Sequence, residues 1–256
     1  MNDDKGPILY HVISPSLVTR YVHEQAVVGE TLSLVNMWGY RGGMPKLGKY
    51  GYHAEERALA ALLTTMHLSR AFRLTGVRVW GNTDRRDVLH AGSHTVCGEN
   101  RELVWALTVE ETRWVCLRFL AWQTKQIVYP RTPERTHEQM AIRVAALTAL
   151  QGIERNDEEN KDELFRELRK AHSQIEGDSD GEISSVLMLI RSVYDTRQMY
   201  AISMSDAWGD RISDVMWYSV YSRTWRTASD ARNDAEAPAH QVLEALIAKA
   251  LEARGS

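Results

Sequence analysis

His53 and Glu55, separated by a single alanine, have the most suggestive catalytic spacing in the chain. In zinc-dependent nucleobase deaminases, a His-x-Glu pair at a helix start supplies a zinc ligand and a proton-shuttling carboxylate, and a downstream Pro-Cys-x-x-Cys supplies further ligands. This chain has two cysteines, Cys97 and Cys116, which are far apart in sequence, and neither follows a proline. We therefore expect no deaminase. Instead, Glu55 is expected to stabilise a helix N-terminus, and His53 to cap or pack at the helix start.

Two further segments contain residue types that bind metals. His90, His94 and Cys97 fall within one short stretch that predicts a loop, but no fourth ligand lies nearby. The acidic segment 176–183 partly matches a calcium-binding EF-hand loop, but Leu187 occupies the position of the bidentate glutamate. We therefore expect no tightly bound zinc or calcium, no cofactor, and folding that does not depend on a metal.

A glycine-rich, partly basic loop from Gly39 to Gly51 precedes the helix expected near Glu55. Glycines favour turns, and a helix N-terminus offers unpaired N–H groups and a positive dipole end to an anion. We therefore predict that any ligand groove lies near residues 51–55, the alternative being that the glycines only let the chain turn. The candidate anion- or ligand-binding residues are His11, Arg41, Lys46, Lys49, His53, Glu55 and Arg57. No residue is assigned a catalytic role.

The elements that must position these residues form a small module up to about residue 108. Runs of β-forming residues predict strands at 8–13, 76–80 and 103–107. Apolar residues at helical spacing predict a helix that begins near Glu55 and continues to Met66. The first domain is therefore expected to be α+β and to span residues 1–108.

Beyond residue 108 helical spacing dominates. Glu110 to Lys125 reads as one helix, and apolar stripes mark further helices within 140–150, 164–175, 183–194, 217–225 and 242–251. The overall prediction is an α+β protein whose second domain, 109–256, is mainly α-helical. An aromatic row in that domain could stack on bases or hold a partner, although helically spaced aromatics also suit a core: Trp208, Trp217, Tyr218, Tyr221 and Trp225.

The composition is that of a globular protein with nearly balanced charge. Hydrophobic residues make up 44% and charged residues 25%, with a net charge of −3, which excludes a disordered chain and a strongly basic nucleic-acid coat. Nucleic acid remains a possible partner that the net charge does not indicate. No apolar run approaches the about 20 residues that span a bilayer, and the first residues lack the features of a signal peptide. We therefore expect a cytoplasmic protein without a membrane partner.

The order of features resembles a family of uncharacterised bacteriophage proteins. That family has an N-terminal Gly-x-His-Ala motif followed by a helix, similar here to Gly51–Ala54 and then Ala58–Leu62. Its later strands are similar to Val77–Gly81 and Arg101–Leu107, and its C-terminal half is helical and rich in Ala, Trp and Arg. The resemblance implies phage origin and expression in the host cytoplasm, but it implies no reaction.

The expected function is therefore that of a non-enzymatic accessory protein that binds a host or phage macromolecule. The eight Trp and ten Tyr against three Phe support this expectation, because aromatic side chains with a polar group suit interfaces. One alternative is a nucleotide-using enzyme similar to ADP-ribosyltransferases, in which Tyr10-His11, Tyr52-His53 and either Glu99 or Glu102 would form the site. Another is a structural or assembly component of the virion. Whether the protein is an enzyme, and its oligomeric state, stay open.

Overall fold

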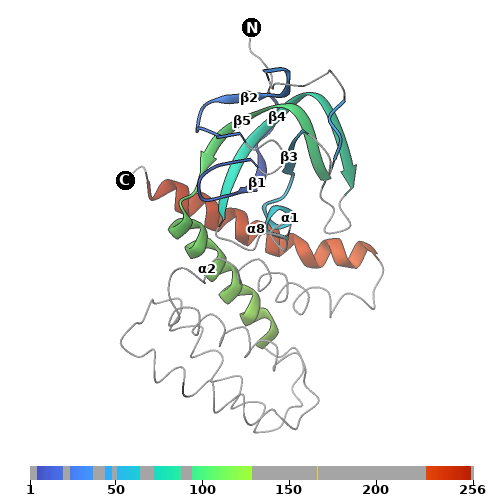
Figure 1. Cartoon of the computed structure of the whole chain (residues 1–256). Coiled ribbons are helices and arrows are strands. Elements are labelled where there is room, and N and C mark those ends of the chain that lie inside the picture. Colours follow the sequence, from blue (N-terminus) through green and yellow to red (C-terminus); the bar gives the residue numbers. More distant parts are fainter. Residues whose placement is uncertain are drawn as a thin grey trace. The chain divides into compact units, whose positions relative to one another are not determined.

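The computed structural model (Figure 1) describes residues 5–19, 24–36, 44–47, 51–63, 72–87, 94–128, 166 and 229–254. The chain divides into two compact units. One comprises residues 1–113 together with 233–256, and the other comprises residues 114–232. The domain boundaries predicted from the sequence, 1–108 and 109–256, stay a prediction; in the structure, residues 233–256 belong to the same compact unit as residues 1–113.

Five strands form one sheet in the first unit. They are β1 (Leu9–Ile13), β2 (Thr31–Ser33), β3 (Tyr52–Glu55), β4 (Arg73–Asp87) and β5 (His94–Ala106). All pairings between these strands are antiparallel, and they form a closed ring in the order β1–β4–β5–β3, with β3 pairing back to β1. Strand β2 pairs with β5 beside this ring. The described N-terminal part is therefore a mostly antiparallel sheet with few helices.

Strands β4 and β5 are longer than the sequence predicted. The expected strand at 76–80 lies in the first half of β4, and the expected strand at 103–107 covers the end of β5 and extends one residue beyond it. Because β5 begins at His94, the prediction of a loop through Cys97 was wrong: His94–Cys97 pair with the end of β4. Register shifts between Gly76 and Val77, and between Trp80 and Thr83, interrupt the β4–β5 ladder. Such irregularities bend paired strands, which helps the sheet to curve into a ring (Figure 1).

The described helices are η1 (Leu34–Asn36), α1 (Ala58–Leu63), α2 (Val109–Val128) and α8 (Ser229–Glu252). Helix α2 confirms the helix predicted at 110–125, and α8 contains the predicted helical stretch 242–251. The other predicted helices, and the aromatic row that begins at Trp208, lie outside the described residues. None of the helices described is long and apolar enough to cross a membrane.

The predicted helix start at Glu55 was wrong. Residues 52–55 form β3, and α1 begins three residues later at Ala58. Glu55 lies opposite Thr95 of β5 and opposite Tyr10 of β1, so the backbone there is paired with two distant strands. These non-local pairings outweigh the local preference of the segment for a helix.

The hydrophobic core of the ring receives side chains from all four of its strands. Its buried members are Leu9, Ile13, Ala26, Ala54, Val77, Val79, Leu103 and Ala106. On the other face of the sheet, Val12 and Leu74 are paired and both are buried. Helix α1 contacts β1 and β3. The two faces of β3 therefore have different surroundings, and this decides what its side chains can do.

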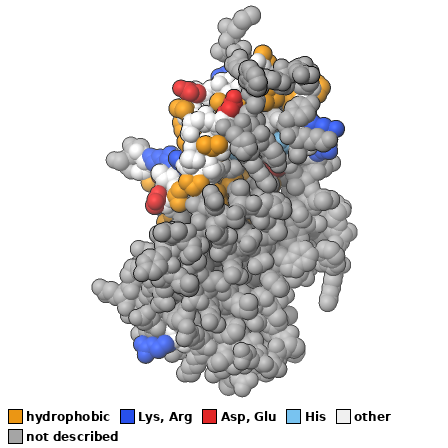
Figure 2. Space-filling model, in the orientation of Figure 1, with side chains coloured by type: hydrophobic (Ala, Val, Ile, Leu, Met, Phe, Trp, Pro, Cys, Tyr) orange, Lys and Arg blue, Asp and Glu red, His pale blue; other side chains and the backbone are white. Residues whose placement is uncertain are grey.

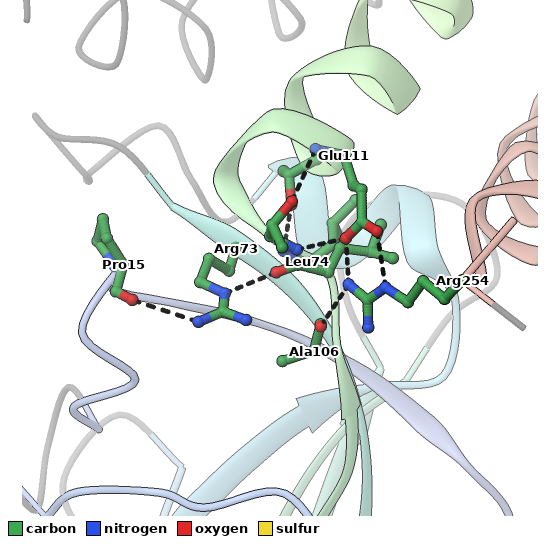
Figure 3. Close-up of polar contacts among 9 residues, drawn as sticks. Pro15, Arg73, Leu74, Ala106, Glu111 and Arg254 are labelled. Atoms are coloured by element: carbon green, nitrogen blue, oxygen red, sulfur yellow. Dashed lines mark hydrogen bonds and ion pairs between the residues drawn. The ribbon is translucent and has the colours of Figure 1, made fainter.

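Polar contacts fix the start of α2 and the end of α8 at one end of the sheet (Figure 3). The backbone N–H of Thr108 donates to Glu111 Oε2 (2.6 Å), and the Glu111 N–H donates to Thr108 Oγ1 (3.1 Å), which makes a reciprocal N-terminal cap. Arg254 donates from Nε to Glu111 Oε1 (2.7 Å), from Nη2 to Glu111 Oε2, and from Nη2 to the Ala106 carbonyl (2.8 Å). One carboxylate therefore caps α2 and holds the end of α8.

Candidate functional site around strand β3

The residues predicted to bind an anion come from several segments of the chain, and the structure describes five of the seven. His11 lies in β1, while His53 and Glu55 lie in β3. Lys46 is exposed in the short described segment 44–47, and Arg41 and Lys49 lie outside the described residues. Arg57 follows β3 and forms an ion pair with Glu244 of α8 (3.7 Å).

His11 and His53 lie on adjacent strands but on opposite faces of the sheet. Tyr10 is opposite Glu55, so these two side chains share a face, and His53 shares that face because it is two residues from Glu55. His11 follows Tyr10 and therefore points to the other face. The sheet thus separates the two histidines that an ADP-ribosyltransferase-like site would need together.

Glu55 is the most unusual carboxyl group of the described sheet. Its side chain is 6% exposed, and the Thr95 hydroxyl lies 2.9 Å from Oε1 and 2.8 Å from Oε2. Burial raises the pKa of Glu55 to about 7, the Thr95 hydrogen bond opposes that rise, and the nearby charge of Glu56 adds to it. Glu55 can therefore gain or lose a proton near neutral pH.

Glu56, which follows Glu55, contacts Arg85 near the end of β4 and His94 at the start of β5, and together with Glu55 and Thr95 we call these residues the glutamate cluster. Glu56 forms an ion pair with Arg85, and its Oε2 lies at hydrogen-bond distance, 2.8 Å, from Nδ1 of His94. Arg85 Nη2 lies 3.1 Å from the same His94 nitrogen. The glutamate cluster therefore joins the ends of three strands through a compact polar network.

The glutamate cluster offers a proton donor or acceptor but no activated nucleophile. Cys97 lies opposite His53, but its side chain is buried, and burial together with the charge of Asp84 raises the pKa of its thiol to about 12. A thiol with that pKa is protonated at neutral pH and is a poor nucleophile. Across the described segments, no three His, Cys, Asp or Glu side chains are arranged to hold a metal ion.

A second polar group lies on the core side of β3. Arg101 of β5 is 2% exposed, and its guanidinium carbon lies 5.2 Å from the centre of the Tyr52 ring. The Tyr52 hydroxyl donates a hydrogen bond to Glu24 Oε2 (2.7 Å). We call Arg101, Tyr52 and Glu24 the arginine site.

The guanidinium of Arg101 is not satisfied by the residues that the structure describes. Its Nε and Nη2 atoms are buried and have no hydrogen-bond partner there. Burial lowers the pKa of Arg101 to about 10, while the charges of Tyr52 and Glu24 act in the opposite direction. Even so, Arg101 stays protonated at neutral pH and keeps two unused donors inside the protein.

In the sequence alone, Arg101 stands out only as part of a strand motif. The sequence does contain a pattern that indicates a buried arginine. Arg101 precedes Leu103 by two residues, which places both side chains on one face of a strand. In the structure, Arg101 lies opposite Val79 and Leu103 lies opposite Val77, so this face is the core face. A charged residue in phase with core residues indicates either a buried ion pair or a ligand contact.

The chain matches no protein-family model, no curated protein and no solved structure.

Proposed function

We propose that the chain is a phage-encoded accessory protein that acts in the host cytoplasm by binding a host or phage macromolecule, without catalysis. The phage origin and the location rest on the sequence resemblance that includes Gly51–Ala54. The binding role is carried by one observation: the buried guanidinium of Arg101, whose Nε and Nη2 have no partner among the described residues. In this proposal, an anionic or otherwise hydrogen-bond-accepting group of the partner occupies those donors.

Energetics supports a binding role for Arg101. A buried donor left without an acceptor costs about 1–3 kcal/mol, and more when the group is charged. An apolar side chain at residue 101 would avoid that cost and would match its neighbours Leu32 and Val79 in the sheet register. An acceptor supplied by a ligand would satisfy the buried donors and give the arginine a function.

Surface features fit recognition of a specific group better than recognition of a polyanion. Figure 2 shows acidic, basic and hydrophobic side chains interspersed on the visible described surface. The tryptophans that the structure describes are all partly exposed: Trp80, Trp105, Trp114 and Trp122. Partly exposed indole rings are typical of interfaces, where they combine apolar contact with a polar N–H.

Affinity capture from expressing or infected cells tests the proposal, with wild type, Arg101→Met and Arg78→Met compared in parallel. Arg78 is a matched control because it lies in β4 and is partly exposed, beside Glu102. We expect a partner that wild type and Arg78→Met retain and that Arg101→Met loses. A nuclease-treated sample shows whether nucleic acid carries the capture.

Equal capture by wild type and a folded Arg101→Met would overturn the assignment of the site. Mass spectrometry of purified particles tests the virion alternative separately, because a structural component is present in them at stoichiometric amounts and an accessory protein is not.

A further inference from the structure

The two unused donors of Arg101 lie on one edge of its guanidinium. Nε and Nη2 both carry N–H bonds that point outward in parallel from this edge, and both atoms are without a partner among the described residues. The spacing of two parallel N–H groups matches the two oxygens of a carboxylate, which accepts both bonds at once. A single-point acceptor would leave one buried donor unsatisfied.

The described neighbours of Arg101 favour a small, flat group that needs few further hydrogen-bond donors. The register neighbours of Arg101 are Leu32 on β2 and Val79 on β4, and the Tyr52 ring lies beside the guanidinium. None of these side chains offers a donor to a third oxygen, since the Tyr52 hydroxyl donates to Glu24. A phosphate at the site would keep oxygens that need donors, whereas a carboxylate uses both of its oxygens on Arg101.

The charges around Arg101 also favour a carboxylate over a phosphate. The site holds one buried cation, and the Glu24 carboxylate already contributes negative potential to it. A phosphate dianion would bring two further negative charges into this buried region, and a carboxylate brings one. Because uncompensated buried charge is strongly unfavourable, the monoanion is the better ligand.

We propose that the arginine site binds a carboxylate group, with one oxygen on Nε and the other on Nη2 of Arg101, in preference to phosphate. This inference rests on the proposed function, in which Arg101 contacts the ligand, and it names the chemical class of the group that is bound. A carboxylate can come from a small organic acid or from the end of a polypeptide chain.

The test is thermal melting and calorimetric titration of the full chain with acetate and with inorganic phosphate at constant ionic strength. We expect acetate to raise the melting temperature in a saturable way and to bind at least about ten-fold more tightly than phosphate. Arg101→Lys keeps the charge but loses the paired donors, so its acetate affinity should fall by about ten-fold or more. Arg78→Met should bind acetate like the wild type.

The dipeptide Ala-Ala with a free or an amidated C-terminus distinguishes the two sources. Tighter binding of the free dipeptide than of acetate, lost on amidation, identifies a chain terminus; tighter binding of acetate identifies a small acid. Both results support the inference. If Arg101→Lys does not fold, competition between acetate and phosphate for the wild-type protein still shows which of the two anions the site prefers.

Stronger binding of phosphate than of acetate, dependent on Arg101, would overturn the carboxylate assignment and leave the proposed function standing. Failure of acetate and the free dipeptide to bind would also overturn it. If partner capture is likewise unaffected by Arg101→Met, the assignment of Arg101 as the partner-binding residue in the proposed function fails as well.

Discussion

Replacement of Glu55 by glutamine should make the protein more stable at high pH and remove one component of its pH dependence. The wild-type carboxyl is buried, and its pKa is raised from 4.5 to about 7. The folded protein therefore holds the Glu55 proton more tightly than the unfolded chain does. The stabilisation that this proton provides is complete below pH 4.5 and is lost as the pH rises through about 7.

The magnitude follows from the difference between the folded and unfolded pKa values. A rise from 4.5 to about 7 corresponds to about 3 kcal/mol of unfolding free energy between pH 4 and pH 9, at about 1.4 kcal/mol for each ten-fold change in the proton dissociation constant. Glutamine has the same shape, cannot ionise, and can still accept a hydrogen bond from the Thr95 hydroxyl. The difference in unfolding free energy, Glu55→Gln minus wild type, should therefore rise by up to about 3 kcal/mol between these pH values.

Urea unfolding followed by circular dichroism at pH 4, 5.5, 7 and 9 measures this difference. Subtracting the wild-type unfolding free energy from that of Glu55→Gln at each pH cancels the contributions of the titratable groups that both proteins contain. Glu30→Gln is the control, because it makes the same chemical change at an exposed position. A Glu55→Gln difference that stays constant within about 0.5 kcal/mol across the range would refute the assignment of Glu55 as a carboxyl that burial keeps protonated.

Three further predictions concern other parts of the first unit. Arg254→Met should lower the unfolding free energy by about 1–2 kcal/mol at pH 7, because it removes charge-assisted hydrogen bonds to a partly exposed carboxylate. Arg254 and the helix cap hold the pKa of Glu111 at about 2. The loss of unfolding free energy in Arg254→Met, measured by urea unfolding, should therefore be complete above pH 4.5 and should shrink as the pH falls towards 2. A loss that is independent of pH would contradict this. Gly76→Ala should destabilise by about 1–3 kcal/mol in the same assay, because its new methyl group would overlap the Trp105 indole, and wild-type stability would show that the contact is loose. Cys97 should resist iodoacetamide at pH 7.5 in the native state and react in urea, because its thiol is buried and burial raises its pKa to about 12. Mass spectrometry measures the labelling, and rapid labelling of the native protein would show that the site opens.

The local sequence pattern was sufficient to predict elements that neighbouring residues specify. Helix α2 was predictable because its apolar residues have helical spacing and acidic residues occupy its first turn. The first strand was predictable because a short β-forming run ends before Ser14-Pro15. In both cases the residues that decide the structure are neighbours in sequence.

The candidate site was harder to predict because distant segments create it. The segment Gly51–Glu55 has the local features of a helix start, but its pairing with β5 and β1 makes it a strand. The burial that shifts the pKa of Glu55 and the contact between Tyr52 and Arg101 both involve residues of this paired segment. No local pattern encodes which strands meet, so the sequence predicted a helix start near Glu55 where the structure has the end of strand β3.

The bond between Arg254 and Glu111 has a consequence for the order in which the protein can fold. Residues on both sides of 114–232 make up a single compact unit, so this unit stays incomplete during synthesis until the segment from residue 233 onward has left the ribosome. Until then, Glu111 and the Ala106 carbonyl lack the guanidinium that they bind in the folded protein. A chain that ends before Arg254 would therefore keep the strands of the sheet but lack the contact that closes the unit.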